Sequence, residues 1–170
     1  MPVHTYIIKE LDANRKVFEN LLELVPEEMI LWKGNSTRWS LLEIVCHLYD
    51  EEKEDFGARV RSVLKNPEKE LAPINPEGWT EERNYKDQDY DEMLFKFLKQ
   101  RKVSVEYLRS LKNAPWKNAY KHSSLGEMSA ELFLANWLAH DHLHIRQIMK
   151  LKYDFLKEVS GQDLSYAGNW

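Results

Sequence analysis

The sequence predicts an all-α protein, a four-helix bundle with one long crossover connection. Four long segments carry apolar residues at spacings of three and four, the period of an amphipathic helix, and nothing of strand length and period lies between them. Hydrophobic residues make up 43% of the 170 residues and charged residues 31%, while glycine and proline number only 6 each, a balance that suits a helical globular domain. Four such helices bury their apolar faces against one another.

The first helix is predicted over residues 4–25, and Pro26 ends it. Residues 26–38 form a connector, in which residues 27–32 are compatible with a short helical turn and residues 34–36 with a sharper turn. The apolar stripe of the first helix consists of Ile7, Ile8, Leu11, Val17, Phe18, Leu21, Leu22 and Val25.

The second helix starts at a capping box, in which the Ser40 side chain caps the backbone and Glu43 reaches back to the cap residue. It is predicted to continue to about Lys65, with His47 at the margin of its apolar side. The connection that follows, residues 66–87, contains three prolines and one glycine, too many helix-breaking residues for a continuous helix. A connection of this length often covers a functional site.

The third helix is predicted over residues 89–111 and is followed by a loop. A second capping box at residues 124–127 is predicted to start the fourth helix, which runs past Leu151 and leaves residues 162–170 as a loose tail. On a helical wheel, one narrow core-facing stripe of the fourth helix holds Phe133, Trp137, His140, His144, Gln147 and Leu151.

Length and composition limit the classes of function. The chain is expected to form a single domain over residues 1–170. A net charge of −4 provides no positive field that would attract nucleic acid, so we expect no nucleic-acid partner. Cys46 is the sole cysteine, so an intrachain disulfide and a C-x-x-C site are both excluded. No leader segment or run of eighteen apolar residues is found, so we expect no membrane partner and a cytoplasmic location.

Histidines in the fourth helix point to a metal site. His140 and His144 stand four residues apart, which places their Cβ atoms about 5–6 Å apart on one helix face. His142 lies about 200° round the helix from His140 and cannot share the same ion. A stable site usually needs a third side chain. His47 is the natural choice, because it is the only other histidine in the middle of a long core-forming helix.

Three imidazoles leave coordination positions open for water or substrate, which is typical of a reactive site. There a divalent ion lowers the pKa of water or holds a thiol as thiolate, and either serves as a nucleophile. Glu51, one turn after His47, is the candidate general base or fourth ligand, and Gln147 is placed to orient the bound water or a histidine. Each residue also has an ordinary interpretation, since core histidines are common and Glu51 belongs to an acidic run that suits a solvated face.

Other metal and hydrolytic signatures are missing. The sequence has no H-E-x-x-H motif, so a zincin-type protease is not indicated. The paired E-x-x-H segments of di-iron bundles are also missing, as are a G-x-S-x-G motif and a glycine-rich phosphate loop.

Two segments resemble the DinB-like family of bacterial stress-linked four-helix bundles. Residues 39–48 (WSLLEIVCHL) resemble its W-S-x-x-E-x-x-x-H-L helix start, and residues 140–148 (HDHLHIRQI) resemble its late H-D-x-x-H-x-x-Q-I signature. With His122 before Gly126, order and spacing match along nearly the whole chain. The resemblance implies a bundle with a crossover connection, often homodimeric, in which the positions of His47, His140 and His144 bind one divalent transition metal, nickel or zinc.

The resemblance also implies a range of activities, among them bacillithiol-type S-transferases and mycothiol-dependent isomerases, while many members have no known reaction. We therefore expect a metal-dependent enzyme of the thiol S-transferase type, acting on a small thiol and an electrophile. A metal-dependent hydrolase at the same site is one alternative. A non-enzymatic, dimeric, stress-related bundle with a structural or sensory metal is the other.

Overall fold

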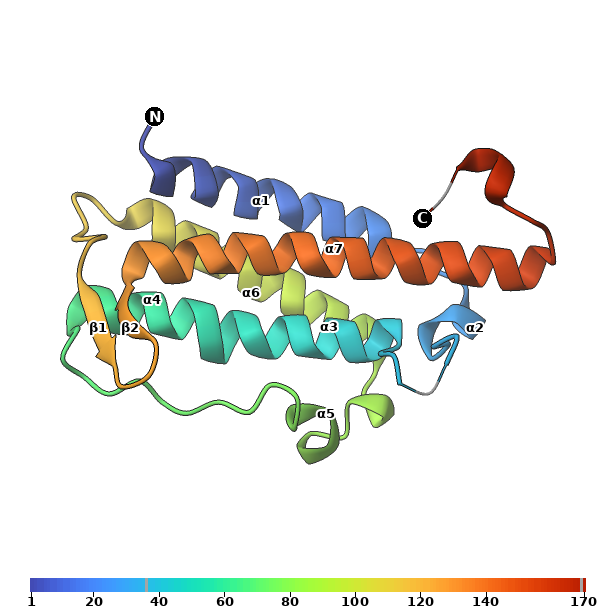
Figure 1. Ribbon diagram of the computed structural model, residues 1–170, viewed down its shortest axis with the longest axis horizontal. Helices are drawn as coiled ribbons and strands as arrows, with labels where there is room; N and C mark the ends of the chain where they lie inside the picture. The colour runs from blue at the N-terminus through green and yellow to red at the C-terminus, as the bar shows by residue number, and fades with distance from the viewer. Residues whose placement is uncertain (36, 169) are drawn as a thin grey trace.

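A computed structural model describes residues 1–35, 37–168 and 170 of the chain and confirms the predicted four-helix bundle (Figure 1). Its long elements are α1 (Val3–Leu22), the α3–η1–α4 rod, α6 (Tyr90–Ser110) and α7 (Ala130–Ser160). Helix α1 packs on α6 and α7, and the α3–α4 rod packs on α6 at one end and on α7 at the other. Figure 1 shows α1 and α7 running in one direction and the other two elements in the opposite direction.

The predicted crossover connection is present. After α4 the chain returns along the outside of the bundle, through the short helix α5 (Trp79–Glu82) and the 3₁₀ turn η2 (Tyr85–Asp87), before α6 begins (Figure 1). Trp79 and Tyr85 are buried and anchor this connection. Because the chain returns to the starting end, α6 runs parallel to the α3–α4 rod rather than forming a hairpin with it.

The second rod begins as predicted and is then interrupted. Ser40 and Glu43 form the capping box of α3 (Leu41–Asp50), with the Ser40 N–H donating to the Glu43 carboxylate at 2.8 Å. A single continuous helix to Lys65 is wrong, because a π-helical turn, η1 (Glu51–Asp55), separates α3 from α4 (Phe56–Lys65). Gly57 accommodates this turn, since a Cβ there would lie 2.8 Å from the carbonyl oxygen of Glu52.

The start of the fourth helix differs from the prediction. Residues 119–129 form an antiparallel hairpin of β1 (Ala119–His122) and β2 (Gly126–Ser129), so the expected absence of strands and the capping box at residues 124–127 are both wrong. Gly126 adopts φ +76°, a left-handed conformation that suits the hairpin turn. Ser129 is the true cap of α7, and its hydroxyl accepts from the Leu132 N–H at 3.0 Å.

The remaining connections agree closely with the sequence. Helix α2 (Glu27–Ile30) is the short turn expected in the first connector; of the predicted turn at 34–36, Ser36 lies outside the described residues. Helix α7 continues to Ser160, and the tail contains one 3₁₀ turn, η3 (Ser165–Ala167). Among the residues that the structure describes, every helix is too short or too polar to cross a lipid bilayer.

Candidate metal centre

The structure brings the three predicted histidines together. His47 lies in the last turns of α3, while His140 and His144 occupy successive turns of α7. The Nε2 atom of His140 lies 3.2 Å from that of His47 and 3.0 Å from that of His144. One ring nitrogen from each histidine lies within 4.8 Å of the others. Three imidazoles from two helices therefore point their Nε2 atoms at one spot.

This arrangement suits a divalent transition metal. In a tetrahedral zinc site with zinc–nitrogen distances of 2.0–2.1 Å, neighbouring ligand nitrogens lie about 3.3 Å apart, close to the spacing found here. The Nδ1 of His144 donates to Oε1 of Gln147 at 2.8 Å, which leaves the Nε2 lone pair of His144 directed at the other imidazoles. This hydrogen bond holds the His144 ring in place, while the supporting role of Gln147 in a metal site stays a prediction. The geometry of the donor set therefore fits a divalent metal.

Burial keeps the three imidazoles neutral. The pKa of His47 is lowered to about 3 and that of His140 to about 2, in both cases chiefly by burial and then by the neighbouring His144. Burial also lowers the pKa of His144, although its hydrogen bond with Gln147 opposes the shift. Neutral imidazole is the form that coordinates a metal, so the lone pairs are available at physiological pH.

Aromatic rings wall the cluster. The ring centroid of Trp39 lies 4.7 Å from that of His47 and 6.4 Å from that of His144, and Phe56 covers His140 at 5.1 Å. Trp39 directly precedes the helix cap Ser40, so the capping box that starts α3 also fixes this ring over the site. Trp39 begins the family-like segment 39–48, and its position directly before the cap was the signal in the sequence for its place over the site.

Glu51 lies one turn after His47 along the chain but does not belong to the histidine cluster. Glu51 is the first residue of the π turn, is buried, and faces the carboxylate of Asp55. Burial, reinforced by Asp55, raises the pKa of Glu51 to about 8. Among the described residues, the group of potential ligands that lie close together contains the three histidines alone. The role of Glu51 as a base therefore stays a prediction.

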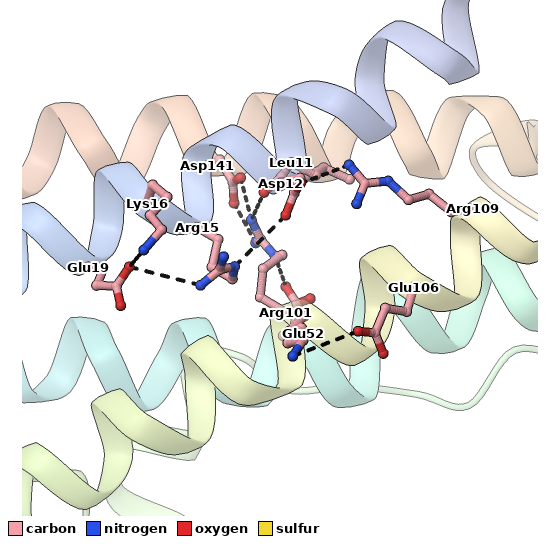
Figure 2. A network of polar contacts seen from close by, with 11 residues as sticks. Leu11, Asp12, Arg15, Lys16, Glu19, Glu52, Arg101, Glu106, Arg109 and Asp141 are labelled. Carbon is pink, nitrogen blue, oxygen red and sulfur yellow. Dashed lines mark hydrogen bonds and ion pairs between the residues drawn. The ribbon is translucent and has the colours of Figure 1, made fainter.

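A second polar cluster, which is buried, includes Asp141, the residue that follows His140. Arg101, on α6, donates two hydrogen bonds to Asp141 at 2.7 Å each and one to Glu52 at 2.8 Å (Figure 2). Asn14 donates to Asp141 at 3.0 Å and Trp137 donates to Glu52 at 3.0 Å. We call these five residues the Arg101 network. It joins α1, η1, α6 and α7.

The Arg101 network was missed from the sequence. Arg101 lies on the apolar stripe of α6 between Phe97 and Val105, four residues from each, which was the signal that its charge is buried. Asp141 follows His140 directly, so the network fixes the turn of α7 that carries one of the three imidazoles. Glu52 lies in the π turn after His47, so the network also fixes the position of that turn.

Other reactive residues lie elsewhere. His142 is exposed on the far side of α7, as its helical position predicted. His122 lies in β1, where its Nδ1 accepts from the backbone N–H groups of Ser124 and Leu125. Cys46 is fully buried, and burial raises the pKa of its thiol to about 12, so it is a packing residue rather than a nucleophile.

Comparison with known proteins agrees with this geometry. The sequence profile of the DinB superfamily matches residues 10–148, a stretch that contains all three histidines. The chain belongs to the DinB superfamily. No curated protein sequence matches this DinB chain.

A solved structure shares the fold of this DinB protein. YfiT from Bacillus subtilis, described as a probable metal-dependent hydrolase with an unusual four-helix bundle topology, superposes with a TM-score of 0.78 over 96% of this chain and 91% of its own. The two sequences are 18% identical, so the likeness concerns the fold. Together with the three-histidine cluster, the DinB fold suggests a divalent metal.

Proposed function

We propose that this DinB protein is a metal-dependent enzyme of the thiol S-transferase type, with His47, His140 and His144 as the ligands of one zinc or nickel ion. The convergence of three neutral Nε2 atoms supports the proposal. Within the described residues, no fourth histidine, cysteine or carboxylate joins the group, which leaves a coordination position for substrate. A divalent ion held there supplies positive charge that lowers the pKa of a thiol or of water.

The surrounding residues prepare this site for chemistry. Gln147 holds His144 in the tautomer with a free Nε2, and Trp39 and Phe56 shield the imidazoles from bulk water. Glu51 is the proposed proton acceptor. With a pKa of about 8 it lies close to neutrality, the range in which a carboxylate can both take and return a proton.

In the proposed reaction, a small thiol loses its proton to Glu51 or to water. Its sulfur then attacks an electrophilic carbon, a carbon–sulfur bond forms, and the leaving group departs with its electron pair. The family resemblance of residues 39–48 and 140–148 favours a thiol as the nucleophile.

Hydrolysis at the same three histidines is the second candidate. YfiT, which shares this fold, is described as a probable metal-dependent hydrolase. In that reaction water takes the place of the thiol, and the same residues hold the site, orient the ligands and accept the proton.

The test is to measure consumption of a small thiol with a chromogenic electrophile by zinc-loaded protein, chelated protein and the variant His144→Ala. The exposed His142→Ala is the matched control on the same helix. We expect chelation and His144→Ala each to lower the rate by at least about 100-fold, and the control to keep it. Thiol consumption that survives both chelation and His144→Ala would refute the proposal.

A parallel ester-hydrolysis assay separates the two reactions. Metal-dependent ester cleavage without thiol consumption would replace the transferase with the hydrolase. If neither assay shows turnover while chelation changes the melting temperature or the association state, the protein is a non-enzymatic bundle with a structural or sensory metal, and a dimer that dissociates on chelation would identify it as such.

A further inference from the structure

A cleft of about 660 Å³ opens beside the three histidines. His144 and Trp39 line it, and both also belong to the cluster, since their rings stack with centroids 6.4 Å apart. The volume lies in the range of clefts that hold small organic ligands. A molecule in this cleft would therefore contact His144, the one histidine of the cluster that lines it, together with Trp39.

The wall of the cleft is positively charged. Its charged lining residues are Arg38, Arg146 and Lys150, and the lining contains no carboxylate side chain. This contrasts with the whole chain, whose net charge is −4. Asp154, outside the lining, pairs with Arg38 at 2.6 Å and also with Lys150. The three cationic side chains of the lining therefore outnumber this one neighbouring carboxylate side chain.

Arg146 is the cation best placed to meet a ligand. Its side chain is exposed, and no ion pair of Arg146 is found among the described residues. Leu143, Arg146 and Lys150 follow one another at spacings of three and four, so they form a strip along α7 next to the stripe that carries His144 and Leu151. Helix α7 thus carries the proposed metal-binding His144 on one strip and the positive charges of Arg146 and Lys150 on the adjacent strip.

The rest of the lining is apolar. Trp39, Leu143, Leu151 and Trp170 supply large hydrophobic surfaces, and the Trp170 ring is held against Tyr153 with centroids 5.3 Å apart. A cleft with apolar walls and a few convergent charges selects a ligand by both its body and its charged group.

We infer that this cleft is the substrate-binding site and that it selects a small organic anion, with a carboxylate or phosphoryl group held by Arg146 and Lys150 and an apolar body against Trp39. The inference rests on the proposed function, because it assigns a substrate class to the same site. It makes Arg146 a specificity-determining residue rather than a metal ligand. The reactive end of the anion then points toward His144.

The test is a binding titration of the full chain, zinc-loaded and chelated, followed by tryptophan fluorescence. Benzylphosphonate and phenylacetate are the anionic probes, one for each type of acid group, and benzyl alcohol is the neutral probe. The variants are Arg146→Gln and, as a control, Lys157→Gln, which removes an exposed charge on α7 that does not line the cleft. Zinc uptake by each variant is measured separately.

We expect at least one anion to bind about tenfold more tightly than benzyl alcohol, and Arg146→Gln to weaken that anion about tenfold. Lys157→Gln should keep the affinity for that anion within about twofold of the unmodified chain, and neither variant should alter zinc uptake. Equal binding of anions and alcohol, or equal anion affinity in Arg146→Gln and the unmodified chain, would overturn the inference.

The outcome separates this inference from the proposed function. Zinc uptake without Arg146-dependent anion binding would support the metal site and refute the anion-binding site. An anion that binds zinc-loaded protein equally with and without the Arg146→Gln change, and does not bind chelated protein, contacts the ion alone and also removes the anion site. Arg146-dependent binding in a chain that takes up no zinc would keep the anion site and refute the metal-dependent reaction.

Discussion

Two polar clusters, one fully buried and the other largely buried, meet at adjacent residues of α7, and they differ in how their polar groups are paired. Asp141 belongs to the Arg101 network, where both of its carboxylate oxygens accept hydrogen bonds from protein groups. Among the described residues, the polar contacts of His140, the preceding residue, are those of its Nε2 atom with the Nε2 atoms of two other histidines. Buried polar groups are nearly always paired. A buried cluster whose lone pairs meet one another is therefore the part of the molecule arranged for a ligand.

The two clusters also differ in the charges of their side chains. The Arg101 network places a cation between two carboxylates, and Glu52 Oε1 is its one carboxylate oxygen left without a partner among the described residues. Burial instead keeps the histidines neutral, because the pKa of each is lowered. One cluster supplies its own counter-charges, whereas the other has room for a positive charge from outside.

The largest expected effect comes from breaking the closed cluster. Arg101→Met leaves Asp141 and Glu52 buried without their cation, so we expect a loss of about 3–5 kcal/mol in the free energy of unfolding by urea. Arg109→Met, on the same helix, removes an exposed pair with Asp12 and should lower that free energy by no more than about 1 kcal/mol. Similar losses of unfolding free energy in the two variants would mean that the buried Arg101 network stabilises the fold no more than an exposed ion pair does.

A pH series tests the neutral histidines in chelated protein. Because the pKa of His47 and His140 lies below the unfolded value of 6.5, the unfolded chain binds more protons as pH falls below 6.5, and stability declines toward pH 3. Each histidine contributes a slope of up to about 1.4 kcal/mol per pH unit. The raised pKa of Glu51 acts in the opposite direction, stabilising the fold as pH falls through 8.

The comparison with a His47→Leu/His140→Leu double variant isolates the histidines, since Glu51 is present in both chains. Between pH 7 and pH 5 the unmodified chain should lose more stability to urea than the double variant does. The exposed His142→Ala variant should follow the unmodified chain. Parallel pH profiles for the unmodified chain and the double variant would show that the imidazoles are not held neutral by the fold.

The smallest expected effect concerns the support of one imidazole. Gln147→Ala removes the acceptor for His144 Nδ1 and should weaken zinc binding about tenfold, as measured by competition with a chromophoric chelator. Gln147→Glu keeps an acceptor at this position and should retain the affinity. Equal weakening in both variants would indicate that packing around residue 147, rather than the hydrogen bond, supports the site.

The sequence was sufficient for features that depend on local pattern. Helical periodicity predicted the four rods, the Ser40 capping box was correct in detail, and the spacing of His140 and His144 placed both on one face. The structure brings His47 next to this pair, and its role as a metal ligand stays a prediction.

Features that depend on tertiary pairing were missed. The π turn at residues 51–55 accompanies the turning of Glu52 toward Arg101, a contact between residues 49 positions apart that no local pattern encodes. The hairpin at residues 119–129 lacks apolar alternation, and its pairing is backbone hydrogen bonding that side-chain pattern does not report. The serine-to-glutamate spacing at residues 124–127 imitated a helix start in the absence of that information.

The distance along the chain between His47 and His140, 93 residues, has a consequence for how the protein matures. Contacts between such remote positions form more slowly than contacts within one helix, because closing so large a loop costs chain entropy. A nascent or partly folded polypeptide therefore displays the His140–His144 pair without its third member. If the three histidines hold the proposed ion, its tight binding should appear only when α3 and α7 have packed together, so ion uptake would report whether a preparation has reached its native state.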